Sequence, residues 1–92
     1  MKRLEDYVDA ARSFNAGIKG DSTLAVVEKL GKDDKTTEYT FNDGVIISHC
    51  WDGGVYGLGY KDYDHDVDVI NDAGYEFDKK SYNRHSSSSR RL

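Results

Sequence analysis

The stretch TTEYTFNDGVIISHCWDGGVYGLGYK, residues 36–61, decides the fold. It contains three runs rich in β-branched and aromatic residues, which are typical of strands. The runs are separated by Asn42-Asp43-Gly44 and by Asp52-Gly53-Gly54. Asp-Gly and Gly-Gly favour hairpin turns because these turns need positive φ angles. The stretch therefore predicts a three-stranded antiparallel meander.

The loops of this meander set its register. A three-residue first loop would pair Phe41 with Val45, and a two-residue second loop would pair Asp52 with Val55. Alternate residues would then share an apolar face, the expected core, which comprises Tyr39, Phe41, Val45, Ile47, His49, Trp51, Tyr56, Leu58 and Tyr60. The other face is small and nearly flat, and comprises Ile46, Ser48, Cys50, Gly57 and Gly59. A two-residue first loop would instead turn the first strand over.

Helical spacing marks the N-terminal segment. Residues 3–16 predict an amphipathic helix with one apolar stripe, which comprises Leu4, Tyr7, Val8, Ala11 and Phe14. Gly17 suits the C-terminal cap, and Ile18 is expected to fold back onto the same stripe. Two further segments, 22–30 and 64–73, fit either a short helix or a strand, and we favour a helix for both.

These elements predict one α+β domain over residues 1–82. In it, the N-terminal helix packs on a three- to four-stranded antiparallel meander, and a second short helix lies at 64–73. A last strand would contain Tyr75 and Phe77. Residues 83–92 are polar, serine-rich and basic, and we expect them to form a flexible tail.

No nucleophile or zinc pattern is complete. Adjacent strand residues point to opposite faces, so His49 and Cys50 cannot bind one metal or act as base and nucleophile. The predicted register places His49 opposite Leu58 and Trp51 opposite Tyr56. Since Cys50 is the single cysteine, the chain has no internal disulfide, and we expect a small buried or half-buried thiol.

The run DYDHDVD, residues 62–68, begins like a calcium-binding EF-hand loop. Val67 stands where the turn glycine belongs, and Ala73 where the bidentate glutamate belongs, so calcium is not expected. Gly57 and Gly59 lack a phosphate-loop pattern. They would either admit a closely packed helix or leave a flat surface for another molecule, and we favour the packed helix. The sequence therefore predicts no catalytic, metal or cofactor site.

Charge is distributed unevenly along the chain. Residues 1–78 carry eight basic residues against all 17 acidic ones, a formal charge of −9, whereas five basic and no acidic residues follow. An acidic body favours a basic partner. The residues expected to contact a partner protein are Asp62, Tyr63, Asp64, Asp66, Asp68 and Tyr75. The N-terminus has no apolar signal region and no apolar run approaches membrane-spanning length, so we expect a cytoplasmic protein.

The opening helix, EYTFNDGVIISH at 38–49 and the acidic, tyrosine-rich second half resemble phage-encoded anti-CRISPR proteins. The resemblance is narrower to inhibitors of the type I-F surveillance (Csy) complex. It implies a stoichiometric, non-enzymatic protein of the host bacterial cytoplasm that binds the guide-RNA complex and blocks target DNA. We expect this protein to be a monomer. Basic residues would then lie near guide-RNA phosphates; they are Lys79, Lys80, Arg84, Arg90 and Arg91.

Two other classes of function stay open on the sequence. A small RNA- or DNA-binding module would act through the basic C-terminal residues, with an affinity that falls steeply as salt rises. A hydrolase would use His49, His65 or His85 together with aspartates, although no spacing joins a nucleophile, a base and an orienting group.

Overall fold

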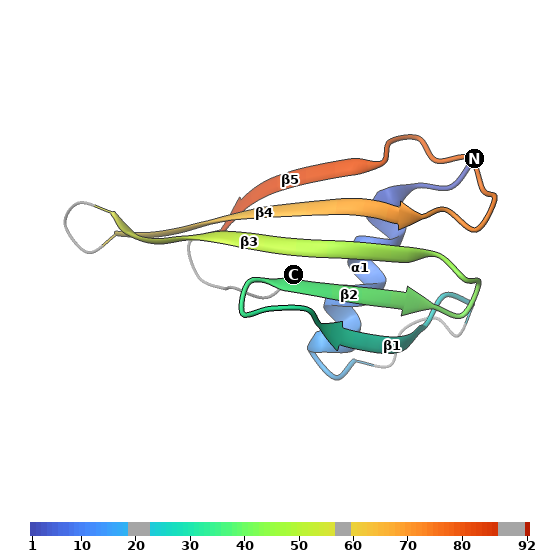
Figure 1. Ribbon diagram of the computed structural model, residues 1–92, viewed down its shortest axis with the longest axis horizontal. Coiled ribbons are helices and arrows are strands. Elements are labelled where there is room, and N and C mark those ends of the chain that lie inside the picture. The colour runs from blue at the N-terminus through green and yellow to red at the C-terminus, as the bar shows by residue number, and fades with distance from the viewer. Residues whose placement is uncertain (19–22, 57–59, 87–91) are drawn as a thin grey trace.

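The computed structural model describes residues 1–18, 23–56, 60–86 and 92. One helix, α1 (Leu4–Asn15), lies across one face of an antiparallel sheet (Figure 1). The strands are paired in chain order and comprise β1 (Val26–Gly31), β2 (Thr36–Phe41), β3 (Ile46–Tyr56), β4 (Tyr60–Asn71) and β5 (Ser81–Ser86). The predicted α+β class is confirmed, with five strands in place of three or four. The face that α1 does not cover is called the open face below.

Helix α1 forms as its apolar spacing predicts, except that Phe14 is 47% exposed and lies outside the buried stripe. Its buried stripe contains Leu4, Tyr7, Val8 and Ala11. Gly17, with φ at 70°, follows the helix and supplies the left-handed conformation that ends it. The prediction for Ile18 is wrong, because this side chain is 62% exposed and does not return to the stripe.

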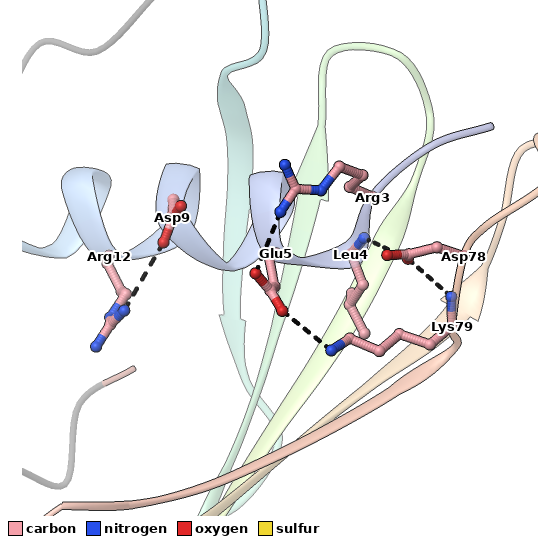
Figure 2. Close-up of polar contacts among 7 residues, drawn as sticks. All are labelled: Arg3, Leu4, Glu5, Asp9, Arg12, Asp78 and Lys79. Atoms are coloured by element: carbon pink, nitrogen blue, oxygen red, sulfur yellow. Dashed lines mark hydrogen bonds and ion pairs between the residues drawn. The ribbon is translucent and has the colours of Figure 1, made fainter.

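The start of α1 is tied to the segment before β5, as Figure 2 shows. Asp78 Oδ1 accepts hydrogen bonds from the Leu4 N–H, at 3.1 Å, and from the Lys79 N–H, at 2.7 Å. The bond from Leu4 is the main reason that the pKa of Asp78 lies below its usual value. Lys79 Nζ lies 3.0 Å from Glu5 Oε1, and the other oxygen of the same carboxylate, Oε2, pairs with Arg3 at 3.4 Å. Asp78, which is distant in the sequence, thus accepts a hydrogen bond from an N–H group that has no partner within the helix.

The first loop has the predicted register. The Phe41 N–H donates to the Val45 carbonyl over 2.9 Å, and Tyr39 lies opposite Ile47 in the β2–β3 pair. These four side chains are buried, as expected for the core face. The prediction that His49 belongs to this face is also confirmed, since it is 3% exposed.

The second loop is not where the sequence places it. Strand β3 continues through Gly53, which pairs with Tyr63, so Trp51 lies opposite His65 instead of Tyr56. A Cβ on Gly53 would lie 2.3 Å from the Asp62 carbonyl oxygen, at a φ of 151°. This glycine is therefore explained by close approach of the β4 backbone, which the sequence pattern does not distinguish from a turn.

Two predicted helices are strands. Residues 26–31 form β1, and 64–71 belong to β4, so the second short helix is wrong. In β4, period-2 alternation outweighs helical capping signals because Val67 is buried in the core while Asp66 is exposed.

The C-terminal boundary also differs from the prediction. Strand β5 includes residues 83–86, so the domain extends past residue 82, and Leu92 is 6% exposed within the core. Phe77 makes only an isolated bridge with Lys2 and is not in a strand. The prediction that Gly57 and Gly59 admit a helix lies outside the described residues.

The core lies between α1 and the sheet. The Tyr7 ring meets Phe41 edge-on, with centroids 4.9 Å apart, and a tilted Phe77 ring at 5.4 Å. The Tyr7 hydroxyl donates to Asp43 Oδ2 over 2.5 Å, and Asp43 Oδ1 accepts from the Val45 N–H at 3.0 Å. One helix residue is therefore anchored to the first hairpin loop.

The Tyr7→Phe variant isolates this anchor. Because it removes a hydrogen bond to a carboxylate while keeping the ring, we expect a loss of about 1.5–3 kcal/mol in unfolding free energy. Denaturant unfolding of the two proteins measures it. A matched loss in Asp43→Asn would support the pair, whereas an unchanged midpoint in Tyr7→Phe would contradict it.

Candidate functional site

Strand β4 presents a row of carboxylates on the open face of the sheet. Its odd-numbered residues turn toward α1, where His65 and Val67 are fully buried. Its even-numbered residues turn to the open face, and those at 62–68 are Asp62, Asp64, Asp66 and Asp68. Every second residue of an extended strand is about 6.6–6.8 Å from the last. The sequence therefore builds a regular line of negative charge.

A fifth carboxylate joins this row from β3. Asp52 lies directly opposite Asp64, and directly opposed strand residues share a face. Like charges in this position oppose each other and destabilise the pair. Asp52 has an 80% exposed side chain, with Lys35 Nζ 3.5 Å away. We call Asp52, Asp62, Asp64, Asp66 and Asp68 the acidic face.

Strand β5 borders the acidic face with uncharged donors. Asn83 Nδ2 donates to Asp64 Oδ1 and to Asp66 Oδ1, at 2.7 Å in each case. Ser81 Oγ donates to Asp68 Oδ1 over 2.8 Å. These bonds hold the carboxylates in place without neutralising them. Among the side chains that the structure describes, Lys35 pairs with Asp52, and His85 Nδ1 lies 3.9 Å from both Asp62 and Asp64 and forms ion pairs with them only when it is protonated.

The structure brings together the four aspartates predicted to contact a protein partner, but not the two tyrosines. Tyr63 lies on the helix side of the sheet, where its ring meets Trp51 edge-on at 5.7 Å. Tyr75 lies between β4 and β5, is 37% exposed, and has Lys2 Nζ 4.5 Å from its ring centroid. The tyrosines therefore face away from the aspartates or lie apart from them.

The residues predicted to lie near guide-RNA phosphates do not form one basic surface. Lys79 pairs with Glu5 at 3.0 Å, and Lys80 Nζ lies 2.9 Å from Asp72 Oδ2. Arg84 is half-buried and pairs with His65 in the β4–β5 register, on the side of the sheet that α1 covers. Arg90 and Arg91 lie outside the described residues. The described basic residues are thus distributed over separate surroundings.

Cys50 lies on the open face beside the acidic face. It is opposite Asp66 and is exposed, so the expectation of a buried or half-buried thiol is wrong. The alternation of β3 correctly separates it from His49, which is buried on the other side. The sequence does not reveal that, in the part of the chain that the structure describes, no second layer covers this side of β3. The sequence pattern likewise indicates a turn at Asp52, which the structure places within β3 opposite Asp64.

A buried histidine pair lies beneath the acidic face, on the helix side of β3 and β4. His49 Nε2 and His65 Nδ1 are 2.8 Å apart, and their rings are stacked with centroids at 5.0 Å. Burial is the main cause that lowers the pKa of His49 to about 4, followed by charge on His65, Arg84 and Lys29. One ring donates and the other accepts, so both can remain neutral. Alternation along each strand directs each ring toward α1, but only the register between β3 and β4 brings the two rings into contact.

Two other kinds of feature are absent from the described part of the chain. It holds no group of three or more histidine, cysteine, aspartate or glutamate side chains arranged to bind a metal ion. None of its helices is long and apolar enough to cross a membrane. The acidic face is therefore the feature from which function is argued.

Comparisons with known proteins do not identify a relative. No protein-family model, curated protein or solved structure matches the chain.

Proposed function

We propose that this protein is an anti-CRISPR inhibitor, carried by phage and acting in the bacterial cytoplasm. It binds the type I-F surveillance complex and blocks the binding of target DNA. The observation that carries the proposal is the acidic face, where five aspartates share one side of β3 and β4. The resemblance of residues 38–49 and of the acidic second half supports the choice of target.

The mechanism is occupation of a basic groove. A protein that binds DNA neutralises its regularly spaced phosphates with lysine and arginine. The aspartates of β4 offer a regular line of negative charge to the same cations, and the open sheet face lets them approach. Complementary charge also speeds the encounter of the two proteins. DNA is then excluded both by charge neutralisation and by the volume of the bound protein.

The maintained repulsion between Asp52 and Asp64 fits this role. Opposed like charges weaken the fold, and a partner's lysines or arginines would relieve the repulsion on binding. The proposal requires no bond to be broken, so the protein acts without catalysis or a cofactor. Lys79 and Lys80 would have to exchange Glu5 and Asp72 for phosphates before either contacted guide RNA. We therefore assign most of the binding energy to the acidic face.

The test uses purified type I-F complex and a labelled duplex that carries the target sequence. With this protein added first in excess, we expect the complex to retain the protein and to lose duplex binding. Free guide RNA and free duplex should not bind the protein alone. Full duplex binding with saturating protein would overturn the proposal, and binding to free RNA or DNA would favour the small nucleic-acid-binding module.

A further inference from the structure

We propose that two copies of this protein associate through β1, joining their sheets edge to edge into one continuous antiparallel sheet. Strand β1 is the first of the sheet order, and Val27–Gly31 are all exposed. Four of the exposed large apolar side chains belong to β1 and to the end of α1 beside it: Phe14, Ile18, Val27 and Leu30. This inference does not depend on the proposed function, and it replaces the monomer expected from the sequence.

The backbone of β1 shows which of its groups face outward. The Lys32 N–H donates to the Thr36 carbonyl over 2.9 Å, in register with the pairing of Leu30 with Glu38. Residues of an antiparallel pair alternate between bonded and non-bonded positions. Leu30 therefore bonds to β2, whereas Lys29 and Gly31 direct their N–H and C=O groups toward the outer edge. Among the described strands none pairs with this edge, so these outward groups can form a second ladder of the same kind.

Side chains select one register for that ladder. Direct partners share a face, so even-numbered residues must pair with even-numbered ones. A register centred on Lys29 would place this lysine opposite its own copy. One centred on Gly31 would place Glu28 opposite Asp34. A register centred on Leu30 avoids both repulsions.

The register centred on Leu30 also supplies complementary contacts. Glu28 lies opposite Lys32 of the second copy on the open face, and the reverse pair forms by symmetry. Lys32 Nζ also lies 3.3 Å from Glu38 Oε2 of its own chain, so Glu28 joins an existing ion pair. Leu30 meets Leu30 of the second copy between these two charge pairs. Lys29 lies opposite Gly31 of the second copy, so their outward backbone groups meet and bond. Side-chain charge and backbone direction thus select the same arrangement.

The outer edge of β1 is also apolar on the helix side, where the C-terminal end of α1 lies beside it. Lys29 Nζ bonds to Asn15 Oδ1 at 2.6 Å, which places the last turn of α1 beside β1. Phe14 lies in this last turn and is 47% exposed, and Ile18, just after the helix, is 62% exposed. Because the two copies keep their helices on the same side of the joined sheet, these apolar side chains approach their counterparts across the dimer axis.

Charge reversal tests the register with the whole chain. By analytical ultracentrifugation we expect the unmodified protein to sediment at twice the mass of one chain, and Glu28→Lys and Lys32→Glu each to sediment as monomers. A mixture of the two variants should recover the dimer, since both pairs then become complementary. A monomer at every concentration of the unmodified protein, or a mixture that stays monomeric while the unmodified protein is dimeric, would overturn the proposal.

Cross-linking gives a second measurement that does not depend on affinity. In a Cys50→Ser background, Leu30→Cys would face itself in a non-hydrogen-bonded pair with Cα atoms about 4.5 Å apart, within disulfide range. Mild oxidation should give a covalent dimer. The matched variant Glu28→Cys should not cross-link. In this register residue 28 faces residue 32 of the second copy, so the two introduced cysteines are four residues apart along the strands, about 13 Å. No cross-link at Leu30→Cys, or equal cross-linking at both positions, would contradict the arrangement.

Discussion

Lowering the pH from 7 to 4 is expected to remove about 3 kcal/mol from the free energy of unfolding through His49 alone, since each unit of pKa difference corresponds to about 1.4 kcal/mol. The folded pKa of His49 is lowered to about 4 from 6.5. Between these values the unfolded chain binds a proton that the folded chain does not. Stability therefore rises with pH across this window, is complete above about 6.5, and is lost as the pH falls toward 4.

The chemical cause is the enclosure of the histidine pair. Protonation of His49 would place a charge at a site that is 3% exposed, beside His65, with Arg84 and Lys29 adding positive potential. Urea unfolding at a series of pH values measures the slope. The carboxylates of Asp33, Asp72 and Asp78 also have lowered pKa values, but they titrate below the histidine window.

A double variant separates the pair from other titrating groups. In His49→Leu together with His65→Leu both polar partners are removed, so neither is left buried without its bond. We expect the unfolding free energy of this variant to stay level between pH 4 and 6.5 and still to fall below pH 4. NMR titration of the imidazole protons in the unmodified protein gives an independent result. A His49 that titrates near 6.5 in the folded chain would contradict the enclosure argument.

Removing the charge of β4 is expected to weaken binding to the surveillance complex on the order of 100-fold, because four pairs would each lose a few tenths to one kcal/mol. The variant carries Asn in place of Asp62, Asp64, Asp66 and Asp68. Asparagine keeps the shape and the acceptor oxygens that bond to Ser81 and Asn83. Binding measured over a range of salt concentrations should also lose most of its salt dependence.

The matched control makes the same change of net charge elsewhere. Asn in place of Asp6, Asp9, Asp33 and Asp34 removes four exposed aspartates that lie outside the acidic face. We expect this control to bind within a few-fold of the unmodified protein. Equal weakening in both variants would show that net charge, and not the acidic face, governs association.

The first hairpin was predictable because its local and distant signals agree. The turn at Asp43-Gly44 fixes the register, and the alternation of Val45, Ile47 and His49 sends each to the core. Helix α1 was predictable for the same reason, since its apolar stripe and the glycine at its end point to one set of bounds. In both cases short-range chemistry alone decides the structure.

The rest depends on partners that lie far along the chain. Gly53 has the chemistry of a turn, yet its small size serves the close approach of the β4 backbone. The segment 64–73 carries residues that favour helix caps, but pairing with β3 and β5 makes residues 64–71 part of a strand, in which aspartates and valines point to opposite faces. Because the sequence pattern ends β3 in a turn at Asp52 and places the last strand at Tyr75 and Phe77, it can put the aspartates of β4 on a surface without locating Asp52 or Cys50 beside them.

Cys50 gives the most direct test of the claim that the acidic face binds the surveillance complex. It is the single cysteine, it is exposed, and it lies opposite Asp66. The measurement is the rate of its modification by a thiol reagent, with and without saturating complex. A control thiol, Asp9→Cys in a Cys50→Ser background, lies on α1 at a distance from the acidic face. We predict that complex slows the reaction of Cys50 and leaves the control unchanged; an unchanged rate at Cys50 while the complex is bound would contradict the claim.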